Sequence, residues 1–298
     1  MGWTSSAPLG LGLTYLSTSV CAMLKPELVA GFVSTRELSE NELYLGLWRL
    51  LGVELLGVAL VTSKQIVHPH RGMFLGMSGF CFLLGTLSLV ALTQGSSGWN
   101  PDFAAISAFV HWTLFVAFMA SIVYLPTARS LDKSPKFLIL VMTALLFCVG
   151  MNYFLMWQGT IGRFILKDVL KQASSADLVT MGYAIVVWGI VKVALGIVTM
   201  TMAPNASKYD LMMLGAYAWS MLSATGLLCL NLGKGVFDEN EAYAAMALYG
   251  SLAVAYVFLG LTYDVPTRRT KAESTNVLES TTKKEKGTSS APESKKTK

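Results

Sequence analysis

The sequence predicts an all-α, polytopic membrane protein, a helical bundle with eight transmembrane helices, and three observations lead to that fold class. Of the 298 residues, 53% are apolar and only 14% are charged, whereas soluble domains carry about 25% charged residues. The mean hydropathy is +0.53. Apolar runs of about 20 residues, the length of a membrane-crossing helix, recur along the chain. A water-soluble globule, a disordered chain and a nucleic-acid-binding module are thereby excluded.

Eight stretches are long and apolar enough to span the hydrocarbon core of a bilayer. The first follows Met1 to Pro8, which carry no positive side chain, so we expect it to stay as an anchor rather than be cleaved as a signal peptide. Two segments between spans, at 28–33 and 161–169, have apolar residues at helical spacing and predict interfacial helices. The predicted spans are 7–24, 43–62, 73–92, 103–125, 137–157, 178–202, 211–232 and 243–263.

Residues 266–298 form a basic tail that we expect to be disordered. The tail holds nine Lys or Arg and four Asp or Glu, and this difference accounts for the whole formal net charge of +5. It lacks aromatic residues and cannot bury enough apolar surface to fold. Its positive charge predicts a cytosolic C-terminus, and eight spans then place the N-terminus in the cytosol too. Lys295 and Lys296 resemble the dilysine retrieval signal of endoplasmic-reticulum membrane proteins, which predicts that organelle.

The two halves of the chain align with each other, which predicts an internal duplication. A shift of 140 residues places PTAR at 126–129 on PTRR at 266–269, in each case directly after a fourth span. Apolar composition does not explain the recurrence of this polar motif. Because four spans return the chain to the same side, the two units are expected to be parallel. The predicted domains are a first four-helix unit at 1–128, a cytosolic linker at 129–136, a second unit at 137–265 and the tail at 266–298.

A family resemblance is carried by KPELVAGF at 25–32 and YLGLWRLLG at 44–52. This pattern resembles the DoxX-like four-helix membrane proteins, in which a proline-containing turn precedes an Arg-x-x-Gly helix. The resemblance implies a four-helix fold and very little about activity. The second half departs from it, because Trp188 stands at the position matching Arg49 and Val191 at that matching Gly52.

Small residues are concentrated in the third span of each half. They are Gly72 and Gly76 in the first half, and Gly215, Ala216 and Ser220 in the second. Small residues at helical spacing permit close approach of two helix backbones. The pattern predicts either packing within the chain or a seam between two copies.

Four ionisable residues lie inside the predicted spans, where each costs at least about 2.5 to 3.5 kcal/mol on insertion. Arg49 lies near a span end, from which its side chain can reach the interface. Glu54 and Lys192 lie near mid-membrane in helices that the duplication makes equivalent, and we predict that they form an interior ion pair. The pair is either a clasp between the units or part of a solute or proton site. His111 is either a hydrogen-bonded structural residue or part of such a site.

The sequence contains no motif of a known catalytic or metal centre, so we predict no catalytic residues, no metal and no cofactor. Its four cysteines lie in apolar runs at unrelated spacings and are expected to be free thiols. Two functions are favoured: a transporter or carrier of a small molecule or lipid, and a non-catalytic endoplasmic-reticulum scaffold or cargo-handling protein. A lipid-modifying enzyme is a weaker alternative. The expected partners are the lipid bilayer, a small-molecule or lipid ligand, and a membrane protein or second copy, without nucleic acid. The candidate binding residues are Arg49, Glu54, His111 and Lys192.

Overall fold

The protein is described by a computed structural model, which covers residues 3–34, 42–67, 69, 71–94, 98–125, 136–203, 206–232 and 235–263. These residues form helices, connecting turns and two isolated bridges, and eight of the helices are long and apolar enough to cross a membrane. The predicted multi-pass, all-α fold is therefore confirmed. The long helices are α1 (Trp3–Leu24), α4 (Glu42–Val67), α5 (Arg71–Gln94), α6 (Pro101–Ile122), α7 (Lys136–Leu155), α10 (Ser175–Met202), α11 (Lys208–Ala224), which continues as the π-helix η2 (Thr225–Leu232), and α12 (Glu239–Thr262).

Short helices occupy the two segments where interfacial helices are expected. They are α2 (Pro26–Val33), α8 (Trp157–Phe164) and α9 (Lys167–Gln172). Each half contains one isolated antiparallel bridge. In the first half, Ser34, directly after α2, pairs with Trp99, directly before the N-cap of α6. In the second half, Ile165, directly after α8, pairs with Phe237, directly before the N-cap of α12. The N-cap residues Asn100 and Asp238 then accept backbone N–H groups of α6 and α12. In both halves, therefore, a backbone bridge followed by an N-cap residue closes one end of the bundle.

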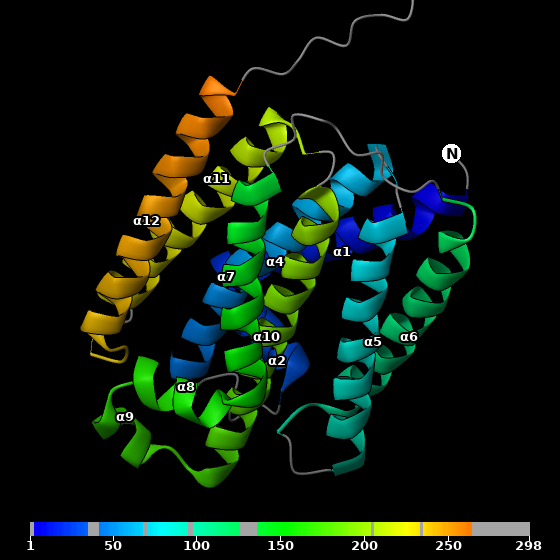
Figure 1. Cartoon of the computed structure of the whole chain (residues 1–298). Coiled ribbons are helices and arrows are strands. Elements are labelled where there is room, and N and C mark those ends of the chain that lie inside the picture. Colours follow the sequence, from blue (N-terminus) through cyan, green and yellow to red (C-terminus); the bar gives the residue numbers. More distant parts are fainter. Residues whose placement is uncertain are drawn as a thin grey trace, which may run out of the picture. The chain divides into compact units, whose positions relative to one another are not determined.

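Helices α4 and α10 form the centre of the bundle. Their spanning segments are 83% and 78% buried, against 50% or less in the other six. Helix α1 packs along α4, and α7 packs along α10. The α5–α6 pair lies on one flank and the α11–α12 pair on the other (Figure 1). Because α5 leans on α10 and α11 contacts α4, the two halves are interleaved. The duplication itself, with its division at 128 and 137, stays a prediction.

Backbone contact joins α7 to α10. A Cβ atom added at Gly189 would lie 2.6 Å from the backbone nitrogen of Phe154, and one added at Gly150 would lie 2.8 Å from the carbonyl oxygen of Gly189. The Thr143 and Thr199 hydroxyls meet at 2.9 Å across the same interface. Lipid tails are as apolar as the helices, so close packing and interhelical hydrogen bonds hold such a pair together.

The glycines singled out in the sequence lie at helix crossings within the chain. A Cβ atom at Gly72 or Gly76 of α5 would lie 2.6 Å from an α10 side chain, and one at Gly215 of α11 would lie 2.8 Å from an α12 side chain. Ala216 is exposed and Ser220 is half-buried, with the Ser220 hydroxyl donating to the Ala216 carbonyl oxygen. A role of Ala216 and Ser220 in packing, within the chain or between copies, stays a prediction.

Candidate functional site

A cavity of about 460 Å³ lies between α1, α2, α4, α5 and α6, and we call it the α1–α6 cavity. Leu51 and Leu55 of α4 and Val110 of α6 are among the apolar side chains that form its wall. Thr14 of α1, together with Ile106 and Val110 of α6, lines the cavity and is also exposed at the molecular surface. The cavity therefore opens between α1 and α6. Both helices are long and apolar enough to cross a membrane, and in a bilayer an opening between them would face lipid.

Polar groups gather at one part of this wall, around His111. The Tyr15 hydroxyl of α1 lies 2.5 Å from Nε2 of His111, and Nδ1 of His111 lies 2.7 Å from the backbone carbonyl oxygen of Ser107. The Ser107 hydroxyl is 2.8 Å from the Ser88 hydroxyl of α5. A continuous hydrogen-bonded chain therefore links α1, α6 and α5 beside the apolar cavity.

Local sequence positions His111 in this chain. Ser107 and His111 are four residues apart, so both side chains lie on the same face of α6. Helix α5 approaches that face closely because Gly85 has no side chain: a Cβ atom there would lie 2.8 Å from the Trp112 ring and 3.4 Å from His111 Cβ. The rings of Tyr15 and Phe80 pack with centroids 5.4 Å apart, which holds the tyrosine against α5.

Glu54 and Lys192 form the predicted ion pair, and the structure buries it completely. The Lys192 ammonium donates to Oε1 of Glu54, to the Tyr249 hydroxyl at 3.0 Å and to the Tyr217 hydroxyl at 3.3 Å. The Tyr217 hydroxyl donates to the other carboxylate oxygen of Glu54 at 2.7 Å. The ammonium also lies 5.6 Å from the centre of the Trp188 ring. This cluster joins the central helices α4 and α10 to α11 and α12.

The ion pair has little bonding capacity left for a solute. Its two charged side chains are 0% and 1% exposed. All three ammonium protons and both carboxylate oxygens have partners within the cluster. The ammonium therefore has no free proton for a solute.

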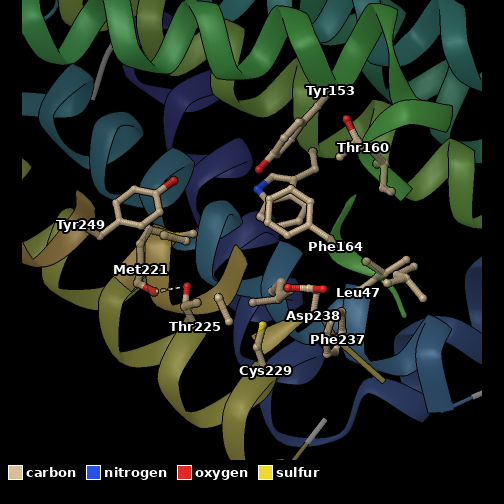
Figure 2. Close-up of a pocket in the computed structure, with 16 residues that line it drawn as sticks. Leu47, Tyr153, Thr160, Phe164, Met221, Thr225, Cys229, Phe237, Asp238 and Tyr249 are labelled. Atoms are coloured by element: carbon tan, nitrogen blue, oxygen red, sulfur yellow. Dashed lines mark hydrogen bonds between the residues drawn. The ribbon is translucent and has the colours of Figure 1, made fainter. Parts of the chain in front are cut away.

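A second, smaller cavity adjoins the ion-pair cluster. It measures about 40 Å³, room for only a few water molecules. Tyr153 of α7, Tyr249 of α12 and Asp238 of the preceding turn approach it from different sides (Figure 2). Asp238 is engaged as the N-cap of α12, and the Thr225 hydroxyl donates to the carbonyl oxygen of Met221. This cavity is too small for a lipid.

The structure separates the four candidate binding residues. Glu54 and Lys192 meet, His111 belongs to the α1–α6 cavity, and half-buried Arg49 forms no ion pair with the described residues. Across the described ranges there is no group of three or more His, Cys, Asp or Glu side chains that could hold a metal ion. Lys295 and Lys296 lie outside the described residues.

Sequence reasoning missed the partners of both polar groups. The four-residue spacing of Ser107 and His111 is a signal that points to a shared helix face. Tyr15, Tyr217 and Tyr249 carry a weaker signal, because each is a hydroxyl-bearing residue inside an apolar span. Nothing in one sequence pairs Tyr15 with a histidine 96 positions away or Tyr217 with a glutamate 163 positions away.

Comparison with known proteins assigns no family to this chain: no protein-family model, curated protein or solved structure matches it. The resemblance to DoxX-like proteins stays a prediction. Function is therefore read from the side-chain geometry.

Proposed function

We propose that this multi-pass membrane protein binds one amphipathic, lipid-like molecule in the α1–α6 cavity and acts as its carrier. The single observation that carries the proposal is the cavity itself. It combines a volume of about 460 Å³, an apolar wall, one polar cluster and an opening toward lipid. Ligand cavities have about 300 to 1,000 Å³ and a few placed polar groups in an apolar lining.

The lining chemistry favours a molecule that dissolves in the bilayer. None of the described residues that line the cavity is Asp, Glu, Lys or Arg. A charged solute would therefore lose its hydration without gaining a counter-ion, at a cost of several kcal/mol. A lipid-like molecule avoids that cost, because it reaches the opening between α1 and α6 from the hydrocarbon.

The ion-pair cluster has a different role in this proposal. Glu54 and Lys192 are sealed and mutually satisfied, which supports the clasp rather than the solute site. Binding is assigned to His111 and Tyr15 at the cavity wall. A scaffold would not need such a cavity, and a bound protein partner would indicate that function instead.

The test is native mass spectrometry of the full chain purified in a mild detergent. We expect a lipid-mass adduct on the wild-type protein. Val110→Trp fills the cavity wall and is expected to abolish the adduct. Val116→Trp is the matched control, because Val116 lies on the same helix, is also exposed and does not line the cavity.

Two outcomes would contradict the proposal. One is an equal adduct on Val110→Trp and Val116→Trp, which would place the lipid outside the cavity. The other is a stoichiometric protein partner without any lipid, which would favour the scaffold. Size-exclusion profiles and far-UV circular dichroism of both variants report whether the substituted chains are folded.

A further inference from the structure

We infer that the molecule held in the α1–α6 cavity is a neutral lipid alcohol, whose hydroxyl group donates a hydrogen bond to the Tyr15 hydroxyl oxygen. The inference rests on the proposed function and deepens it. It follows from the positions of the protons in the hydrogen-bonded chain around His111, which determine what kind of group remains unsatisfied at the cavity wall.

The backbone determines the state of the histidine ring. A carbonyl oxygen only accepts, so His111 must donate from Nδ1 to Ser107 O, 2.7 Å away. A second proton on Nε2 would make the ring an imidazolium. Within the described part of the chain, no carboxylate lines the cavity to balance that charge, and an unpaired charge in an apolar site is costly. The ring is therefore neutral, and Nε2 is an acceptor.

The neutral ring in turn fixes the tyrosine proton. Because Nε2 accepts, the Tyr15 hydroxyl must donate to it over the 2.5 Å separation. The phenol proton is thereby engaged, and the lone pairs of the Tyr15 oxygen are the remaining hydrogen-bonding capacity of the pair. At this position the wall offers an acceptor.

The serine hydroxyls of the same chain are oriented in the same sense. Ser88 donates to the carbonyl oxygen of Leu84 at 2.8 Å, so the 2.8 Å contact between Ser88 and Ser107 uses the Ser107 proton. Neither serine has a proton left for a ligand. An acceptor group placed here would meet only oxygen lone pairs.

The hydroxyl groups of α1 repeat this pattern at the mouth of the cavity. Thr14 donates to the carbonyl oxygen of Gly10 at 2.8 Å, and Ser17 and Thr18 both donate to that of Thr14 at 2.9 Å. Each hydroxyl that lines the cavity among the residues the structure describes thus directs its proton to the protein. The indoles of Trp48 and Trp99 also bring N–H donors to the wall, and the backbone of Trp99 is bridged to Ser34, directly after α2.

A head group that donates a proton suits the part of the wall formed by Tyr15, Ser88 and Ser107. A carboxylate or phosphate brings charge and acceptors alone, and an ether brings an acceptor alone, so at this position each would face oxygen lone pairs without a donor. An alcohol supplies the missing proton. The cavity extends along α6 from Phe103 to Leu114, a rise of about 16 Å, which gives an apolar body room beside the hydroxyl contact.

The experiment compares three probes that share one chain and differ in the head group: 1-hexadecanol, hexadecyl methyl ether and hexadecanoic acid. Delipidated full-length protein in mild detergent is titrated with each, and the bound fraction is read by native mass spectrometry. We expect the alcohol to bind roughly tenfold or more tightly than the ether or the acid, the factor that one unpaired polar group implies.

The double variant Tyr15→Phe/His111→Leu separates the anchor from the rest of the cavity. It removes the tyrosine oxygen together with the ring nitrogen that Tyr15→Phe alone would leave free to accept a proton, so we expect the alcohol and the ether to bind it with equal affinity. A merely structural effect would weaken both probes and leave their ratio unchanged. Val110→Trp should abolish binding of all three.

The outcomes distinguish the inference from the proposed function. If the wild-type protein binds all three probes equally and Val110→Trp abolishes this, the cavity binds lipids but the preference for an alcohol is wrong. A wild-type preference for the acid, or an unchanged alcohol-to-ether ratio in Tyr15→Phe/His111→Leu, overturns the inference in the same way. If no probe binds and the purified protein carries no lipid, the proposed function fails, and the inference fails with it.

Discussion

We expect Glu54 and Lys192 to stabilise the folded protein as a pair, so that either residue without the other lowers the free energy of unfolding. Glu54→Gln removes the carboxylate charge but keeps an oxygen that accepts from Tyr217. It leaves the Lys192 ammonium buried with tyrosine hydroxyls as its remaining hydrogen-bond partners. Lys192→Met leaves the carboxylate with one remaining partner, at 2.7 Å. Because each single variant strands a charge at 0 or 1% exposure, each should lower the free energy of unfolding by about 3 to 5 kcal/mol.

The double variant removes both charges and should be more stable than either single variant. Its main unmet group is the Tyr249 hydroxyl, which loses the donor now at 3.0 Å, at a cost of about 1 to 3 kcal/mol. The coupling energy between the two positions is therefore at least about 3 kcal/mol. The assay is unfolding of the detergent-solubilised protein by titration with sodium dodecyl sulfate, followed by tryptophan fluorescence.

The exposed pair Asp168 and Lys171 on α9 provides a matched control. Its side chains are separated by 3.0 Å yet are 89% and 76% exposed, so Asp168→Asn and Lys171→Met should show little or no coupling. If Glu54→Gln/Lys192→Met instead loses as much free energy of unfolding as the two single variants added together, the two residues are not coupled. If the pair only holds the helices together, the double variant should also retain its lipid adduct. Loss of the adduct in a folded double variant would instead indicate that Glu54 takes part in lipid binding.

Three further predictions concern the helix contacts. Gly189→Ala should lower the free energy of unfolding by about 1 to 3 kcal/mol, because the new methyl group would lie 2.6 Å from a backbone atom of α7. Gly10→Ala, which has no atom within 4 Å, should leave it unchanged or slightly higher, and an equal loss in both would contradict the contact. Thr143→Val should lower the free energy of unfolding by about 0.6 kcal/mol, because the hydrogen bond to Thr199 is lost. Adding Thr199→Val should then lower it no further. Asp238→Ala should cost about 0.5 to 2 kcal/mol by removing the N-cap of α12, checked by thermal unfolding with Asp238→Asn as the conservative control.

Sequence was sufficient for the elements of the fold. Eight apolar runs predicted eight long helices, because a bilayer requires about 20 apolar residues and internal backbone hydrogen bonds from each span. The cost of a buried charge singled out Glu54 and Lys192, and the structure joins them. Gly72, Gly76 and Gly215 were recognised as small residues at helical spacing, and each lies against another helix.

The neighbours of each helix in the bundle could not be predicted in the same way. The predicted units place α5 with α4 in one four-helix unit. In the structure α5 packs against α10, and α11 contacts α4. In a lipid environment an apolar helix gains little from burial as such, so its neighbour is decided by local shape and polar contacts. Those contacts join residues far apart in the chain, as in the 138-residue separation of Glu54 and Lys192.

The sequence by itself determined the class of protein, the number of spans and the residues that could not face lipid unpaired, because these follow from solvation and length. Only the tertiary structure decided which polar residues meet: it sealed Glu54 with Lys192 and gave His111 a separate place beside an open cavity. The physical reason is that a hydrogen bond depends on ångström-scale geometry between helices. The donor and acceptor directions at Tyr15 and Ser107, on which the proposed ligand chemistry depends, exist only once α1, α5 and α6 are packed together.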